Sequence, residues 1–278
     1  MFDLVALPLS IASGAAVTLW VVRRFPNRML RPNFQKRQIP NACGLVLVVS
    51  SVLYFGGATQ TENGQREVVA ALYLIAGAGF GVLGLIDDLW GDRSVGGLGG
   101  HLRALMRGQV TTGAIKAIGG LVLGLACGWL LHPASWRSVL TAAVVAGMSN
   151  SLNLVDLRPG RCLSMFFVGL VPLAPKFAQV ALNGSGAATH PLVFALAVAI
   201  LLFAGERKAM FMLGDTGSNS FGAVLGVAYA IYLPDVRVQL AIAGMIVLFH
   251  AWTERHSLSR AIDNSPLLRR LDAKIGVR

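Results

Sequence analysis

Acidic residues end or begin three apolar stretches of the chain, where charged residues are otherwise few. Asp87 and Asp88 end the run GLIDD after one apolar stretch, and Asp156 ends the run SNSLNLVD after another. Asp215 lies in GDTGS, directly before a third apolar stretch. If these apolar stretches lie in a membrane, ionised groups at their ends are costly and usually functional. Adjacent carboxylates also repel each other unless a cation or a basic ligand offsets their charge. The three segments together predict one site; the alternative is that each acid only caps or solvates a helix end.

The segment before Asp156 has the spacing of one helix face. Asn150, Asn153 and Asp156 are each three residues apart, so a helix places them near one face. Amides there can read a base or a sugar, and the carboxylate can hold a metal ion or a hydroxyl group. Arg158 and Arg161 flank a Pro-Gly pair that stops the helix, and two guanidinium groups suit phosphate oxygens. The alternative is a capped turn whose arginines serve only membrane topology.

The GDTGS segment could bind either sign of charge. Asp215 can hold a hard cation through its oxygens. The backbone N–H groups of Gly217 and Ser218 lie near the expected N-terminus of a helix, which favours anions. The alternative is that the aspartate or the serine is an ordinary helix cap.

Four further residues are candidates for substrate binding. Lys36 and Asn41 belong to the basic segment 23–41, whose Pro-Asn turn is its expected working end. Lys116 lies about one turn into an apolar stretch, where its ammonium group could extend to the membrane interface or reach a phosphate. His256 borders the last apolar stretch.

The elements that must position these residues are membrane helices. The chain has 278 residues, of which 55% are hydrophobic and only 13% charged. This excludes a soluble globular enzyme, a disordered chain and a simple coiled coil, because soluble domains have about 25% charged residues. A membrane helix needs about 20 mostly apolar residues. An all-α bundle of about nine such helices is predicted, at 3–22, 42–58, 67–86, 111–131, 137–155, 162–182, 190–205, 218–233 and 238–253.

The basic residues predict the orientation of these helices. All but four of the 24 lysines and arginines fall on one side of the predicted spans; the exceptions are Arg66, Arg137, Lys176 and Arg237. Positive charge marks the cytoplasmic side, so the N-terminus is expected outside and the C-terminus in the cytoplasm. This bias explains most of the net charge of +11 without a nucleic-acid partner. Residues 1–253 are predicted to form the membrane domain, with its site at the cytoplasmic face, and 254–278 an interfacial helical tail.

The motifs resemble those of a known family. RQIPNACG, GLIDD, N-x-x-N-L-x-D and FMLGDTGS are similar, in this order and with matching intervening spans, to the motifs of polyprenyl-phosphate N-acetylhexosamine-1-phosphate transferases. These are membrane enzymes of glycosyltransferase family 4, and they include the enzyme that makes the first lipid-linked peptidoglycan precursor. The ordered set is specific and covers nearly the whole chain.

The resemblance implies a reaction and a set of roles. A polyprenyl phosphate attacks the β-phosphorus of a UDP-sugar, and UMP leaves; Mg²⁺ is required. Asp215 would carry the ion with Asp156 close by, while Asp87 or Asp88 would accept the lipid phosphate's proton or help hold the metal. Asn150 and Asn153 would face the nucleotide. The resemblance also implies the bacterial cytoplasmic membrane, with the site facing the cytoplasm, and a homodimer.

The chain departs from the family pattern at several places, including two of its motifs. Members commonly carry D-G-x-D-G, but here the run is D-L-R-P-G-R, so the second acid is absent. His256 is only a loose counterpart of a histidine-rich loop. A non-catalytic relative that binds lipid phosphate or envelope-assembly partners is therefore an alternative. A transporter is a weaker alternative, because its ionisable groups should lie near the middle of the membrane.

Overall fold

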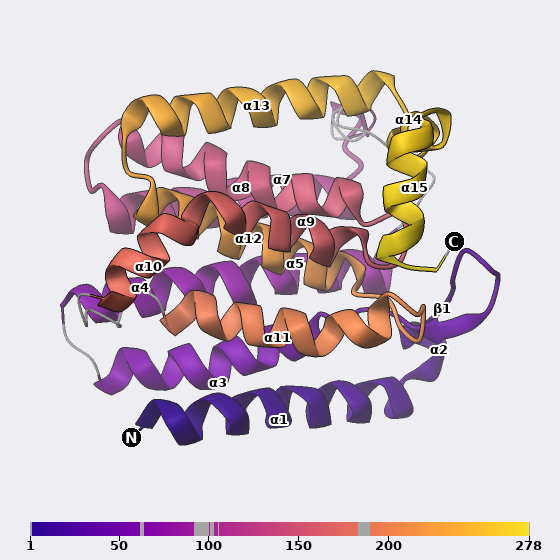
Figure 1. The fold of residues 1–278 in the computed structure, drawn as a ribbon, viewed down its shortest axis with the longest axis horizontal. Helices are drawn as coiled ribbons and strands as arrows, with labels where there is room; N and C mark the ends of the chain where they lie inside the picture. Colours follow the sequence, from indigo (N-terminus) through magenta and orange to yellow (C-terminus); the bar gives the residue numbers. More distant parts are fainter. Residues whose placement is uncertain are drawn as a thin grey trace.

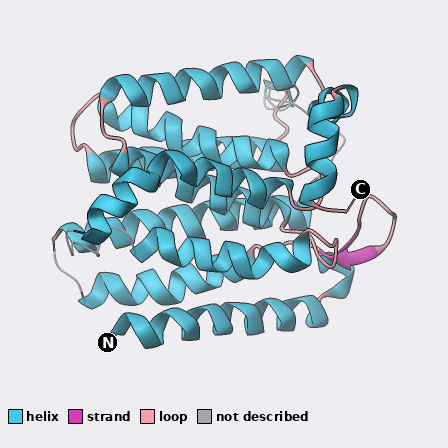
Figure 2. Ribbon diagram, viewed as in Figure 1, coloured by secondary structure: helices cyan, strands magenta, loops and turns pink. Residues whose placement is uncertain are grey.

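The computed structural model describes residues 2–61, 64–91, 100, 103–104, 106–182 and 190–277. Over these residues the chain is almost entirely helical, which confirms the predicted helical fold. The helices run back and forth along one long axis, and the two termini lie towards its opposite ends (Figure 1). Figure 2 shows that the strands form only a small hairpin at one end of the bundle.

The described elements fall into two halves of the chain. The N-terminal half contains α1 (Phe2–Arg24), α2 (Pro26–Met29), β1 (Leu30–Pro32), β2 (Gln38–Pro40), α3 (Leu45–Thr61), α4 (Gln65–Leu74), η1 (Ile75–Gly79), α5 (Phe80–Trp90) and α7 (Thr112–Leu131). The C-terminal half contains α8 (Arg137–Val155), α9 (Arg161–Leu170), η2 (Val171–Leu173), α10 (Ala174–Leu182), α11 (His190–Glu206), α12 (Gly214–Tyr232), α13 (Val236–Arg255), α14 (Leu258–Asn264) and α15 (Pro266–Ile275).

Four of the described helices are long and apolar enough to cross a membrane. They are Glu67–Trp90, which joins α4, η1 and α5, and the helices Thr112–Leu131, Arg137–Val155 and Val236–Arg255. Leu45–Gly56 and Pro191–Glu206 are apolar but shorter. Large apolar side chains such as Leu121 and Leu248 are exposed on these helices, as lipid contact requires. The count of nine spans, their orientation and the boundary at residue 254 stay predictions.

Helix α12 forms the centre of the bundle. Its side chains are buried almost without interruption from Thr216 to Ala230. Glycines allow neighbouring helices to approach it closely, which is the packing role that small residues have in membrane helices. A Cβ atom on Gly84 of α5 would overlap the backbone carbonyl of Asp215, and one on Gly222 would overlap the carbonyl of Met148 in α8. The ends of α5 and α8 are therefore held directly beside the start of α12.

The π-helical turn η1 interrupts the third predicted span. It leaves the carbonyl of Gly77 as the acceptor of a 2.7 Å hydrogen bond from the Ser220 hydroxyl of α12. Such single π-turns often occur where a helix must realign side chains. Here the turn lies between α4 and α5, and the Ser220 hydrogen bond connects it to the central helix α12 two turns before the GLIDD segment.

Two motifs that are far apart in the sequence lie side by side. The hairpin pairs Leu30 with Pro40 in antiparallel register. The chain then runs along the segment before α12: Met212 N–H donates to Pro40 O (2.8 Å), and Cys43 N–H donates to Met212 O (3.1 Å). These bonds join the RQIPNACG segment to the FMLGDTGS segment.

The C-terminal helices lie across one end of the bundle. Helix α15 runs roughly at right angles to the long helices (Figure 1). It begins at Pro266, and Ser265 caps it by accepting the N–H of Leu268.

Candidate active site

The site is built around Lys116, near the start of α7. Its ammonium nitrogen lies 3.2 Å from Asp87 Oδ2 of α5 and also contacts Asp215 Oδ2 at the start of α12. Its side chain is only 19% exposed. Both predictions for Lys116, an extension to the membrane interface or a contact with a phosphate, stay predictions; the structure shows its charge between two carboxylates. Asp87 and Asp215 are thereby brought to one cation from elements 128 residues apart.

Asp88 has a different partner from its neighbour. Its Oδ1 accepts the Asn41 amide N–H (3.0 Å) and the backbone N–H of Asp215 (3.1 Å). Its Oδ2 accepts the backbone N–H (2.9 Å) and the hydroxyl (2.6 Å) of Thr216. A carboxylate at the N-terminus of a helix is stabilised by the free N–H groups and the helix dipole. Asp88 therefore caps α12 from another helix and ties Asn41 to it.

A protein carboxylate lies beside the predicted anion site at GDTGS. Asp88 accepts the backbone N–H groups of Asp215 and Thr216, which precede the predicted donors Gly217 and Ser218. Gly214 has a φ of +69°, and a Cβ atom there would lie 2.8 Å from Asp88 Oδ1, so glycine is needed for both reasons. Gly217 is buried against Gly44, where two segments of the chain approach each other closely. Its position is explained by packing.

Asn153 connects α8 to α12. Its amide nitrogen donates to Asp215 Oδ2 at 3.3 Å, and its carbonyl oxygen accepts the Ser218 hydroxyl at 3.0 Å. Asn150 lies one turn earlier on α8 and is partly buried. The predicted Asn face of α8 is therefore directed, at least at Asn153, to the carboxylate that Lys116 also contacts.

Asp156 follows the last residue of α8. Burial raises the pKa of its carboxyl well above the ordinary value, and the nearby carboxylates of Glu206, Asp215 and Asp88 raise it further. Clustered carboxylates favour a bound cation, which relieves their repulsion. Glu206, at the end of α11, is 3% exposed and accepts the backbone N–H of Gly160 at 2.7 Å. The sequence interpretation did not select Glu206, although it also ends an apolar stretch as the other acids do.

The other predicted substrate ligands have different surroundings. The guanidinium of Arg161 binds Asp272 of α15 and the Ser259 hydroxyl, so it is directed to the C-terminal helices. The guanidinium of Arg158 lies 5.0 Å from the centroid of the Phe34 ring. Lys36 is exposed in the hairpin turn with a φ of +62°, and His256 is exposed and stacks on Trp252.

The donor set fits a divalent cation that the substrate completes. Among the described residues, no group of three or more His, Cys, Asp or Glu side chains is arranged to hold a metal by itself. Mg²⁺ usually binds one or two carboxylates and takes its other oxygens from water and phosphate. Asp87 and Asp215 already surround one cationic group, the Lys116 ammonium, and Asp156 is close enough to Asp215 for their charges to interact. A site with few protein ligands is compatible with these side chains.

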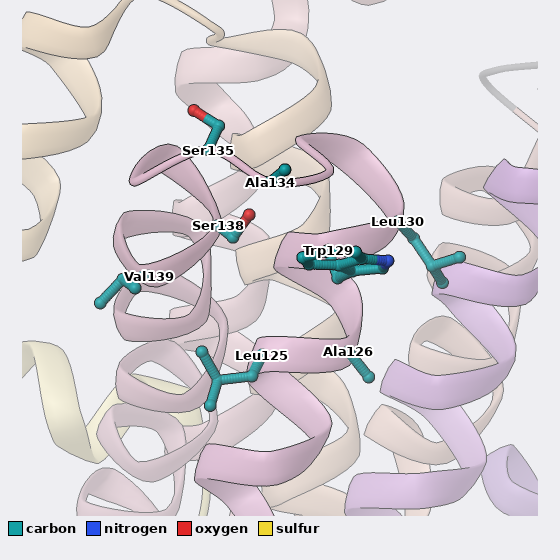
Figure 3. A pocket seen from close by; sticks show the side chains of 8 residues that line it. All are labelled: Leu125, Ala126, Trp129, Leu130, Ala134, Ser135, Ser138 and Val139. Atoms are coloured by element: carbon teal, nitrogen blue, oxygen red, sulfur yellow. The ribbon is translucent and has the colours of Figure 1, made fainter.

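An apolar pocket between α7 and α8 is distinct from this site. On α7 it lies towards the C-terminal end, whereas Lys116 lies near the N-terminal end. Figure 3 shows its lining, in which no side chain is ionisable: Leu125, Ala126, Trp129, Leu130, Ala134, Ser135, Ser138 and Val139. Charged side chains of three helices instead meet in the Asp87–Lys116–Asp215 cluster, which is therefore the candidate active site.

The fold and the cluster define an apolar helical bundle with a carboxylate–lysine site at one end. The chain belongs to glycosyl transferase family 4, whose family model matches residues 70–233. This confirms the family membership that the motifs predicted. The matched range contains Asp87, Lys116, Asn153, Asp156 and Asp215.

Three relatives with this similarity are phospho-N-acetylmuramoyl-pentapeptide-transferases. The Thermotoga neapolitana protein is 26% identical over 194 residues, which are 69% of this chain and 60% of that protein. The Cutibacterium acnes protein is 27% identical over 226 residues, 69% of this chain and 64% of that protein. The Halalkalibacterium halodurans protein is 24% identical over 232 residues, which are 77% of this chain and 67% of that protein. The chain thus spans less than two thirds of the length of the first two.

Proposed function

We propose that the chain transfers a sugar-1-phosphate from a UDP-sugar to a polyprenyl phosphate, giving a sugar-diphospho-polyprenol and UMP. The observation that carries this proposal is the Asp87–Lys116–Asp215 cluster, which lies within the region matched by the family model. An N-acetylhexosamine derivative is the proposed sugar class, in keeping with the relatives' name.

The reaction is an exchange of one phosphorus–oxygen bond for another. An oxygen of the lipid phosphate forms a bond to the β-phosphorus, the bond from that phosphorus to the oxygen bridging to the α-phosphorus breaks, and UMP leaves with that oxygen. A phosphate nucleophile has a second pKa of about 6, so it is largely deprotonated at neutral pH and needs little help from a base. Catalysis of such a transfer consists mainly of positioning and charge neutralisation.

The side chains can be assigned to these tasks. Lys116 neutralises charge on the reacting phosphates, and its contacts with Asp87 and Asp215 hold its ammonium group in place. Asp215 and Asp156 are the proposed ligands of Mg²⁺, which when bound would neutralise diphosphate oxygens. Asn153 orients Asp215. Asp88 positions the start of α12 and does not take part in the chemistry.

The proposed location is the bacterial cytoplasmic membrane, with the site at the cytoplasmic face. The described helices include four that could cross a membrane. The basic segments 23–41 and 254–278 lie at the same end of the bundle as the acidic cluster (Figure 1). Positive charge marks the cytoplasmic end.

The deciding experiment measures UMP release from a panel of UDP-sugars, with undecaprenyl phosphate and Mg²⁺. We expect release with at least one sugar, and loss of release in Asp215→Asn. Asp235→Asn is the matched control, because Asp235 is an exposed acid at the other end of the molecule. Folded wild-type protein that releases no UMP with any sugar would support the non-catalytic alternative instead.

A further inference from the structure

We propose that the C-terminal helix α15 is a clamp that positions the two loops carrying the acidic residues of the site, and that Arg161 acts through this clamp rather than on phosphate. The C-terminal clamp is defined here as Arg161 with Asp272, together with the contacts of residues 274–277. Its role in turnover rests on the proposed function, whereas its effect on the loops does not.

A buried ion pair joins α9 to α15. Arg161 Nε lies 2.7 Å from Asp272 Oδ1, and Arg161 Nη2 lies 2.9 Å from Asp272 Oδ2. The remaining guanidinium nitrogen donates to the Ser259 hydroxyl at 3.2 Å. Arg161 is 5% exposed and Asp272 is 8% exposed. A two-pronged pair of this kind fixes orientation as well as distance, and removing one partner leaves the other charge buried without compensation.

The C-terminal end of α15 packs directly against the loop that follows α8. Gly160 has a φ of +83°, and a Cβ atom there would lie 2.8 Å from Ile275 Cγ2. A Cβ atom on Gly276 would overlap the carbonyl of Pro159. Gly276 therefore meets the backbone of Pro159, and Gly160 meets both the side chain and the carbonyl of Ile275. We expect a displacement of α15 to move residues 159–160 as well.

The same end of α15 also holds the loop after α11. Val277 N–H donates to Arg207 O at 2.9 Å, and the Arg207 guanidinium donates to Lys274 O at 3.1 Å. Glu206 accepts the Gly160 N–H at 2.7 Å and so joins the two loops to each other. One loop follows Asp156 directly and the other leads to Asp215, so one helix holds both approaches to the acidic cluster.

The test compares Arg161→Gln, Asp272→Asn and the double variant. For a clamp, each single variant lowers kcat by up to about 100-fold, because misplacement of about 1 Å can cost this much. The KM for the UDP-sugar changes little, and the double variant is no worse than either single one, since both remove the same pair. If Arg161 instead binds substrate phosphate, Arg161→Gln raises KM and Asp272→Asn has little effect, which would overturn the proposal.

Backbone hydrogen exchange tests the clamp without any turnover. Asp272→Asn should increase exchange at 156–161 and 206–213 while the centre of α12 stays protected. Gly276→Ala should do the same without changing any charge, because its new methyl group pushes α15 off Pro159. Asp263→Asn, an exposed acid on α14, is the matched control and should leave exchange unchanged.

The outcomes separate the two proposals. Wild-type protein that releases no UMP contradicts the proposed function, while the exchange data still decide on the clamp. Should Asp272→Asn unfold the whole protein, Gly276→Ala remains as the test, since it only adds one methyl group and leaves the buried ion pair intact. Exchange at 156–161 that is unchanged in Gly276→Ala overturns the clamp.

Discussion

At the scale of single residues, the adjacent aspartates Asp87 and Asp88 have different partners. Successive side chains of a helix point about 100° apart, so Asp87 turns to Lys116 while Asp88 turns to the start of α12. Asp88 accepts hydrogen bonds at both carboxylate oxygens, whereas Asp87 shares a cation with Asp215. The pair is therefore not one bifunctional unit.

Substitution of these two residues should have opposite consequences. In Asp88→Asn one acceptor oxygen becomes a donor that faces other donors, and an unsatisfied buried group costs about 1–3 kcal/mol. We expect a lower midpoint of thermal unfolding in detergent. Asp87→Asn should keep the midpoint near that of the wild type but lose UMP release. Equal midpoints for the two variants would contradict the capping role of Asp88.

Lys116 is the second prediction at this scale. Lys116→Gln leaves two carboxylates without their shared counter-charge and removes the cation proposed to meet the phosphates. UMP release should fall by about 100-fold or more, the usual cost of losing one preorganised charge-stabilising group. Lys176→Gln, at an exposed lysine of α10, is the control. A rate for Lys116→Gln close to the wild-type rate would remove this assignment.

At the scale of elements, the site depends on how closely α5 and α8 approach α12. The carbonyl of Asp215 lies where a side chain on Gly84 would begin, so α5 and α12 touch through their backbones. This contact places the GLIDD and GDTGS segments together before any side chain of the site interacts. Gly84, which allows the close packing, and Asp87, which contacts Lys116, thus lie within one turn of α5.

Gly84→Ala tests this contact. The new methyl group must push α5 away from α12, and overpacking of this kind costs about 1–3 kcal/mol. The variant should unfold at lower temperature and release less UMP. Gly244→Ala, on α13, meets nothing within 4 Å and should be neutral or slightly stabilising. The comparison of the two unfolding midpoints is the measurement, and equal values would contradict the close approach.

At the scale of the whole molecule, the acidic cluster, the hairpin and the C-terminal helices gather at one end of the bundle (Figure 1). The described cysteines are buried, so we expect them to react little with a thiol reagent and to leave introduced thiols as the main sites of labelling. This allows the proposed orientation to be measured on cells.

A membrane-impermeant thiol reagent should distinguish the two ends. Gln35→Cys places a thiol in the exposed hairpin turn, and Arg237→Cys places one at the opposite end, on α13. We expect labelling of Arg237→Cys on intact cells and of Gln35→Cys only after permeabilisation. The wild-type chain is the control, and the reverse pattern would contradict the cytoplasmic location of the site.

The sequence determined the helical class and the family, and it selected the acids that the structure brings close together, because apolar spans and acids at their ends are local patterns that need no partner to be recognised. It could not separate the partners of Asp87 and Asp88, because these depend on what another helix places opposite. Glu206 carries the same local signal as the selected acids, but only the fold shows its hydrogen bond to Gly160. Arg161 illustrates the same limit: its spacing suited a phosphate, but Asp272, far along the chain, occupies its guanidinium. Only the tertiary structure decided these points, because hydrogen bonds and charge pairs between distant segments depend on contacts that no local pattern specifies.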